Sequence, residues 1–292
     1  MADREMDALL FIDTNILLDF YRDRKSDVST KFLEQIEHCK DRLILGSQLE
    51  MEYKKNRQVV ILETLGKFGL PDWGKLSPPA LISELQPSQM IKKHQKQIST
   101  QHKKVIKKIQ RILKNPRDND DVYKVLQRVF KHSSAFNLNR DSKRRFAIRR
   151  LARKRFFLGY PPRKKNDTSF GDAINWEWML QCSIDSGKDI VIVTRDSDYG
   201  VTYNDESYLN DWLQQEFKQR VSQQRKITLT TKLSEGLKIV HANVTAEMEA
   251  DEARILSHLK IGFSSGETVK IAESIAMTLM DKNGNITETR EI

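Results

Sequence analysis

Two short, strongly apolar segments that each lead into an acidic residue constrain this chain most. Residues 8–12 are wholly apolar and are followed by Asp13, and residues 189–194 end just before Asp196. A continuous apolar run of this length is typical of a strand buried on both faces, as in a parallel sheet. Sites in parallel sheets form beyond the carboxyl ends of the strands. We therefore expect both acids at one edge of an α/β sheet.

Helices alternate with strands on both sides of a different, central segment. The strand candidates are residues 8–13, 43–45, 189–194 and 227–230. The helix candidates are residues 16–18, 29–39, 47–65, 169–186 and 208–221, with a short one around Leu233. This alternation predicts an α/β fold with a parallel sheet.

The central segment is strongly basic. Residues 92–165 hold 25 Lys and Arg against 4 Asp and Glu, a net charge of +21, and the rest of the chain, with 25 basic and 36 acidic residues, carries −11. A charge run is often only a solvated helical face. A surplus of this size instead favours a phosphate backbone as partner, since neutralised phosphates release counterions.

Pattern and composition divide the chain into three parts. Residues 1–65 and 165–240 form a discontinuous α/β domain, and residues 66–164 form a basic helical insertion with helices at 87–112, 121–131 and 141–157. Residues 241–292 form a small α+β extension, with a helix at 246–259 and a hairpin at 274–288 around Asn283 and Gly284.

Several classes of protein are excluded. The two cysteines, Cys39 and Cys182, form no pair at metal-ligand spacing, and the six histidines form no ligand set. No glycine-rich nucleotide-binding loop occurs. No apolar run approaches the roughly 18 residues of a membrane span, and the N-terminus lacks a signal-peptide pattern. We expect a cytoplasmic protein without a membrane partner.

Four acidic residues are expected to lie at the carboxyl edge of the predicted sheet. Asp13 and Asp196 follow strands, while Glu52 and Asp172 lie in the first turns of helices that should pack beside the strand ends. Carboxylates gathered in this way repel one another unless a cation joins them, and Mg²⁺ or Mn²⁺ prefers oxygen ligands. Such a cation activates water and neutralises charge during phosphodiester cleavage. The constellation predicts a metal-dependent nuclease.

Each of these acids also has a purely structural interpretation. Asp13 could cap the following helix. Glu50 stands three residues after Ser47, at capping-box spacing, so we assign Glu50 to the cap and Glu52 to the site.

The same alternative holds for the second pair of acids. Asp172 stands three residues after Ser169 and could serve a cap, and Asp196 and Asp198 could be turn residues. The joint occurrence of the acids at one sheet edge, rather than any single position, favours a site.

Four segments in this order resemble the PIN domain family of nucleases, and within it a bacterial PIN-like subgroup with a large helical insertion. They are residues 11–15, 52–57, 171–176 and 192–199. The resemblance covers roughly residues 8–65 and 165–240. It implies a Rossmann-like three-layer α/β/α sandwich, a Mg²⁺ or Mn²⁺ site and cleavage of RNA.

The resemblance also implies roles for individual residues. The carboxylates expected to bind metal and to act in catalysis are Asp13, Asp172, Asp196 and Glu52, with Asp198 as a further metal ligand. The polar residues expected to orient these carboxylates are Asn15 and Thr194.

We expect an endoribonuclease that leaves a 5′-phosphate and a 3′-hydroxyl. A toxin, a phage-defence effector and an RNA-maturation enzyme would share these sequence features. The residues expected to bind nucleic acid are Lys143, Arg144, Arg145, Arg149, Arg150, Arg153, Lys154 and Arg155. The aromatic residues among them and just beyond could stack on bases or pack onto the core; they are Phe146, Phe156, Phe157 and Tyr160.

Two other functions stay open. A single-strand or structure-specific deoxyribonuclease would use the same metal chemistry, since that chemistry needs no 2′-hydroxyl. A non-catalytic nucleic-acid-binding protein would need a degenerate acidic cluster, whereas all four acids are present. An effector would also need a regulatory protein partner, for which the acidic residues 245–252 are a candidate contact, and the pattern leaves oligomers open.

Overall fold

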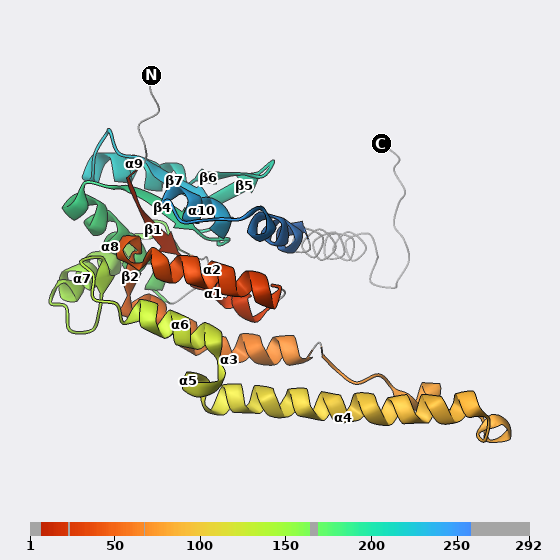
Figure 1. The fold of residues 1–292 in the computed structure, drawn as a ribbon. Helices are drawn as coiled ribbons and strands as arrows, with labels where there is room; N and C mark the ends of the chain where they lie inside the picture. Colours follow the sequence, from red (N-terminus) through yellow and green to blue (C-terminus); the bar gives the residue numbers. More distant parts are fainter. Residues whose placement is uncertain (1–6, 23, 67, 164–168, 258–292) are drawn as a thin grey trace, which may run out of the picture. The chain divides into compact units, whose positions relative to one another are not determined.

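The computed structural model describes residues 7–22, 24–66, 68–163 and 169–257. The chain divides into two compact units, Met1–Val244 and Thr245–Ile292. The first unit is built on a three-stranded parallel sheet in the order β1-β4-β7 (Figure 1). The strands are β1 (Ala8–Ile12), β4 (Asp189–Val193) and β7 (Ile227–Thr230). The predicted parallel α/β sheet is confirmed.

The register of β1 and β4 brings two distant parts of the sequence to one edge. Ile12 pairs with Val193, so Asp13 and Thr194 both follow directly from neighbouring strand ends. The Asp13 backbone N–H donates to the Val193 carbonyl at 2.9 Å. Every residue of both strands is buried, which explains their continuous apolar sequences.

Helices pack closely on this sheet. In α10 (Leu233–Ile239), a Cβ added at Gly236 would lie 2.4 Å from Val193 Cγ2 and 3.1 Å from Leu10 Cδ1, so only glycine permits this approach. Helix α8 (Gly171–Ser186) also packs against β4. With the remaining helices this gives the predicted three-layer α/β/α arrangement.

The other helices of the α/β part of the first unit are short or peripheral to the sheet. They are α1 (Thr14–Leu18), α2 (Ser26–His38), α3 (Ser47–Gly66) and α9 (Asp211–Arg220), with 3₁₀ turns at Asp19–Tyr21 and Lys40–Arg42. Five of the six helices predicted for the α/β part, the short one around Leu233 included, lie at their expected places.

The predicted helix at 208–221 is wrong at its start. Residues 200–209 form an antiparallel hairpin of β5 (Gly200–Tyr203) and β6 (Glu206–Leu209). Its two turn residues, Asn204 and Asp205, have φ values of 48° and 64°. Asn and Asp tolerate this left-handed conformation, which two-residue hairpin turns require.

The basic insertion is helical, as predicted. Its helices are α4 (Gln86–Lys114), α5 (Pro116–Asn119), α6 (Asp121–Phe130) and α7 (Arg144–Leu158), preceded by 3₁₀ turns at Trp73–Leu76 and Ala80–Ile82. It also supplies a strand, because β3 (Asn137–Leu138) pairs in parallel with β2 (Leu45–Gly46). The division at residues 65, 165 and 240 stays a prediction.

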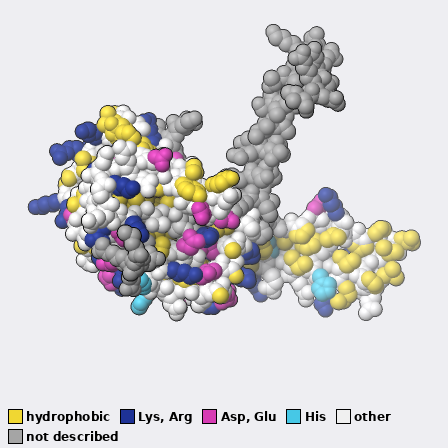
Figure 2. All heavy atoms as spheres, turned by 90° about the horizontal axis from the view of Figure 1, so that it is seen from above, with side chains coloured by type: hydrophobic (Ala, Val, Ile, Leu, Met, Phe, Trp, Pro, Cys, Tyr) yellow, Lys and Arg dark blue, Asp and Glu magenta, His cyan; other side chains and the backbone are white. Residues whose placement is uncertain are grey.

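Apolar side chains spaced seven residues apart form a stripe along α4 that lies partly in solvent. Ile91, Ile98 and Val105 are each between 40% and 49% exposed. Figure 2 shows apolar side chains gathered over α4 and the residues that precede it. The stripe therefore contributes little to the core within the described residues.

A buried ion pair fastens α4 and α6 to α3. The Arg57 guanidinium donates to Asp120 Oδ2 at 2.5 and 2.9 Å and to the Ile112 carbonyl at 3.2 Å. The hydroxyls of Tyr21 and Tyr53 lie 2.6 Å apart, and Tyr21 donates to the same Asp120 oxygen. Paired in this way, the buried charges satisfy one another.

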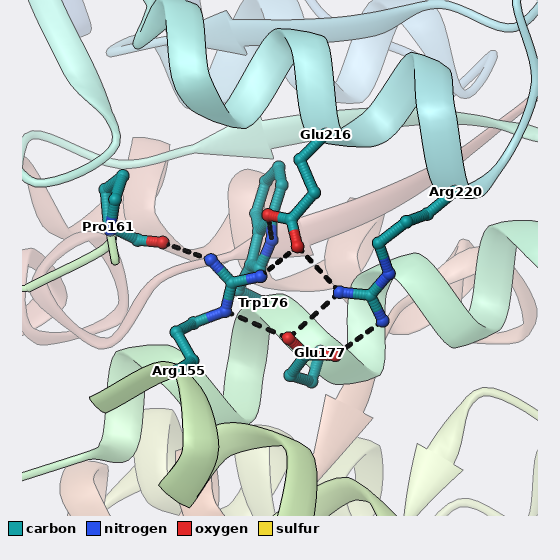
Figure 3. A network of polar contacts seen from close by, with 6 residues as sticks. All are labelled: Arg155, Pro161, Trp176, Glu177, Glu216 and Arg220. Carbon is teal, nitrogen blue, oxygen red and sulfur yellow. Dashed lines mark hydrogen bonds and ion pairs between the residues drawn. The ribbon is translucent and has the colours of Figure 1, made fainter. Parts of the chain in front are cut away.

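A second buried network fastens α7 to α8 and α9 (Figure 3). Arg155 pairs with Glu177 at 2.9 Å and with Glu216, and it donates to the Pro161 carbonyl at 2.5 Å. Arg220 bridges the same two glutamates, and the Trp176 indole donates to Glu216 at 3.0 Å. Arg155 therefore holds the basic helix on the core.

For the residues after α10, the sequence predicted one helix and one hairpin. Residues 246–257 are helical, in agreement with the helix predicted at 246–259, and the predicted hairpin at 274–288 lies outside the described residues. Within the described ranges, no helix is long and apolar enough to cross a membrane.

Replacing Arg155 by Ala should lower the free energy of unfolding by about 3–5 kcal/mol, because it leaves two glutamates without their buried partner. Replacing the exposed Arg150 by Ala should change it by less than about 0.5 kcal/mol. Urea denaturation of both variants measures the difference. Equal stability of the two would contradict the structural role given to Arg155.

Candidate active site

One cleft of about 430 Å³ contains all four acids predicted for catalysis. Asp13 reaches it from the end of β1, Glu52 from α3, Asp172 from the first turn of α8, and Asp196 from the segment after β4. The fold therefore brings together carboxylates that are up to 183 positions apart in the numbering, from Asp13 to Asp196.

Asp13 combines the capping role and the site position that its sequence context suggested. Its Oδ1 accepts the Thr14 backbone N–H at 2.6 Å, which caps α1. Its Oδ2 accepts from Asn15 Nδ2 at 2.9 Å and from the Thr194 hydroxyl at 2.6 Å. Three donors thus fix the orientation of this buried carboxylate.

Thr194 and Asn15 connect the two strand ends. Asn15 Nδ2 lies 3.1 Å from Thr194 Oγ1, and the same hydroxyl oxygen accepts the Asp196 backbone N–H at 3.0 Å. The Thr194 side chain thereby contacts Asp13 and fixes the backbone that carries Asp196. This is the geometry expected of two orienting residues.

Glu52 lies against the start of α8. Its Oε1 accepts from Gln48 Nε2 at 2.6 Å, and a Cβ added at Gly171 would lie only 2.1 Å from that oxygen. Gly171 therefore makes room for the Glu52 carboxylate directly beside Asp172. Ser169 Oγ accepts the Gly171 backbone N–H at 3.3 Å, so Ser169 helps to satisfy the start of α8.

The electrostatics confirm that the four acids are close neighbours. Burial raises the pKa of Asp13 to about 7; the Thr194 hydrogen bond opposes the rise, and the charges of Asp196 and Glu52 add to it. Burial also raises the pKa of Tyr199 well above its ordinary range, and all four site carboxylates contribute. The cluster thus carries an excess of negative charge.

The donor set suits a hard divalent cation. Carboxylate oxygens are the ligands that Mg²⁺ and Mn²⁺ prefer, and the space left by Gly171 admits the fourth carboxylate. In this arrangement no three acidic, histidine or cysteine side chains of the described residues are near enough to hold one metal ion. The carboxylates therefore form an open cluster, which a cation would have to draw together.

The cleft contains residues that the sequence analysis missed, and one predicted metal ligand does not line it. Arg22, Lys55 and Asn56 line the cleft, whereas Asp198 does not. Lys55 and Asn56 stand three and four residues after Glu52, so helical spacing alone would have placed them on the same face of α3.

Most of the basic residues predicted to bind nucleic acid are exposed. The exposed ones are Lys143, Arg144, Arg149, Arg150, Arg153 and Lys154. Arg145 is half-buried, with its guanidinium 4.8 Å from the centroid of the Phe146 ring. Arg155 is only 4% exposed and is held by two glutamates, so its burial argues against the predicted contact with nucleic acid.

The end of α7 lies near the acidic cleft. Arg153 stands 6.0 Å from the centroid of the Phe170 ring, and Phe170 directly precedes Gly171 and Asp172. Arg153 of α7 therefore lies beside the residue that precedes Gly171 and Asp172.

Of the four aromatic residues in and just after α7, two are largely exposed and two pack against other aromatic rings. Phe146 is 63% exposed and Phe157 is 84% exposed, so both are accessible for stacking. Tyr160 packs on Trp212, with ring centroids 5.0 Å apart, and Phe156 contacts Phe170.

The raised pKa of Asp13 predicts a pH-dependent effect of Asp13→Asn. An unfolded Asp titrates near about 4, so the folded protein loses stability as the pH rises from about 4 through about 7. Asn does not titrate, so the variant should gain stability relative to wild type over this range, by about 4 kcal/mol at about 1.4 kcal/mol per pKa unit. Urea denaturation in EDTA at pH 3 and pH 8 measures this, and parallel pH profiles would contradict it.

No curated protein and no solved structure matches the chain. A model of the PIN domain matches residues 10–199, well over half of its length, and this match spans all four acids. PIN domains are in general nucleases that act on nucleic acid and typically use divalent metal ions. From the parallel sheet, the acidic cleft at its carboxyl edge and this match, we conclude that the chain belongs to the PIN domain family.

Proposed function

We propose that this protein is an endoribonuclease that requires Mg²⁺ or Mn²⁺. The observation that supports this best is the convergence of Asp13, Glu52, Asp172 and Asp196 in one cleft of a PIN domain. Burial raises the pKa of Asp13 to about 7 and the charges of Asp196 and Glu52 add to the rise, so a bound cation would favour the ionised form of the cluster. Asp13, Asp172 and Asp196 are the proposed main ligands, with Glu52 completing the set.

The residues of the chain supply orientation and charge for the reaction. Bound in the cleft, a divalent cation acidifies a water molecule and offsets charge on the phosphodiester. Thr194 and Asn15 hold the Asp13 carboxylate in one orientation. Hydrolysis of this kind leaves a 5′-phosphate and a 3′-hydroxyl.

Positive charge near the acids supports a nucleic-acid substrate. Arg22 and Lys55 lie in the cleft wall, where they can contact phosphates next to the bond that is cut. The exposed cations of α7 extend this surface. RNA is preferred in the proposal because the family resemblance points to RNA, and the cleft chemistry would also permit a deoxyribonuclease.

We extend this proposal to the role of the protein in the cell. A ribonuclease of this kind in the cytoplasm would act as a toxin or a defence effector, and it would need a regulatory protein to restrain it. A non-catalytic nucleic-acid-binding protein is disfavoured because the four acids are intact and share one cleft.

The proposal is tested with end-labelled single-stranded RNA and the matching DNA, each with Mg²⁺, Mn²⁺ or EDTA. We expect cleavage of RNA only with a cation. Glu52→Gln should reduce the rate about 1,000-fold, if it removes about 4 kcal/mol of charge stabilisation in the transition state.

Glu50→Gln is the matched control, because Glu50 lies on the same helix and its side chain pairs with Lys54 at 2.6 Å. It should cleave like wild type. Cleavage of DNA alone would replace the ribonuclease by a deoxyribonuclease. Metal-independent cleavage, or equal rates for both variants, would contradict the proposal.

Gly171→Ala should impair cleavage through Glu52. The new methyl group would lie 2.1 Å from Glu52 Oε1, so that carboxylate must move. We expect a loss of rate similar to that of Glu52→Gln, with the fold retained, as circular dichroism would show. A Gly171→Ala enzyme with the wild-type rate would show that the position of Glu52 does not matter.

A further inference from the structure

Tyr199 has a buried hydroxyl without a hydrogen-bond partner among the described residues. Its side chain is 0% exposed, and its hydroxyl oxygen is fully covered. The hydroxyls of Tyr21 and Tyr53, by contrast, bond to each other, and Tyr21 also bonds to Asp120. A buried hydroxyl without a partner has lost its hydrogen bonds to water and gained none in return, which destabilises the folded protein.

The place of this hydroxyl in the fold points to the acidic cluster. Tyr199 follows Asp196 by three residues, and its ring packs against Phe11 of β1, with centroids 6.5 Å apart. The charges of Asp172, Asp13, Glu52 and Asp196 all act on the phenol, and Asp172 acts most strongly. Burial raises its pKa, so the phenol keeps its proton and remains a donor.

Hydrogen-bond donors orient carboxylates of this cluster. Asp13 already receives three hydrogen bonds, from Thr14, Asn15 and Thr194. A carboxylate that binds a metal ion with one oxygen is usually held by a hydrogen bond as well. The Tyr199 hydroxyl is a buried donor near the cluster that has not been used for this purpose.

We propose that Tyr199 is a positioning residue of the cation site, whose hydroxyl donates a hydrogen bond to the Asp172 carboxylate when a divalent cation draws the acids together. This inference rests on the proposed function, since it requires that the cluster binds a cation. The hydroxyl is unpaired without the cation and paired with it. Part of the cost of burying it is therefore recovered only on cation binding.

For Tyr199→Phe, this mechanism predicts unchanged or higher stability without cation but weaker binding of Mn²⁺. Without cation, the variant should be as stable as wild type or more stable, because it loses an unpaired polar group. Its affinity for Mn²⁺ should fall about 10- to 100-fold, as is usual when a partner of a metal ligand is removed. A purely structural tyrosine would show the reverse pattern.

The experiment measures thermal unfolding of the full chain in EDTA and across a Mn²⁺ titration, since binding to the folded state raises the midpoint temperature. The Mn²⁺ concentration for half-maximal cleavage is a second readout. Tyr21→Phe serves as the control: it removes a paired hydroxyl, so it should lose stability in EDTA while its response to Mn²⁺ stays that of wild type.

The outcomes separate this inference from the proposed function. Weaker Mn²⁺ binding by Tyr199→Phe at unchanged or higher stability in EDTA supports it. If wild type responds to Mn²⁺ and Tyr199→Phe responds equally, the inference is overturned and the proposed function stands. A loss of stability in EDTA like that of Tyr21→Phe also overturns it. If wild type shows no response to Mn²⁺, the cation site itself is refuted.

Discussion

Repulsion between carboxylates held in one cleft is the constraint on which the rest of the first unit depends. Burial raises the pKa of Asp13 to about 7, and the charges of Asp196 and Glu52 add to this rise. Such a cluster persists only if the scaffold holds each acid in place. The register of β1 and β4 sets Asp13 beside Thr194, and the absence of a side chain at Gly171 admits Glu52. The site is thus a strained arrangement that is maintained by the sheet and by α8.

The two buried ion networks extend this support to the basic insertion. Arg57 joins α3 to α4 and α6 through Asp120, and Arg155 joins α7 to α8 and α9. The helices held in this way, α3 and α8, are those that carry Glu52 and Asp172. The insertion is therefore bonded to the elements of the site, which explains how a large helical segment within a PIN domain leaves the acidic cleft intact.

The sequence predicted those features that depend on local pattern. Fully buried strands are continuously apolar, so β1 and β4 were predictable, and with them the acids that follow. The hairpin at 200–209 was missed because its strands are short and mostly exposed, which leaves no apolar periodicity. Arg155 was grouped with its neighbours because nothing in a run of cations marks the one that meets glutamates 22 and 61 positions away. The close approach of Glu52 to Gly171 and the unpaired Tyr199 hydroxyl exist only in three dimensions.

The central claim is that these four acids form one cation site. A crystal structure of the protein grown with Mn²⁺, with the ion located by its anomalous scattering, tests it most directly. The account predicts an ion within bonding distance of oxygens from Asp13, Asp172 and Asp196, with Glu52 bound directly or through a water molecule. An ordered cleft without an ion at saturating Mn²⁺, or an ion bound only elsewhere on the protein, would contradict it.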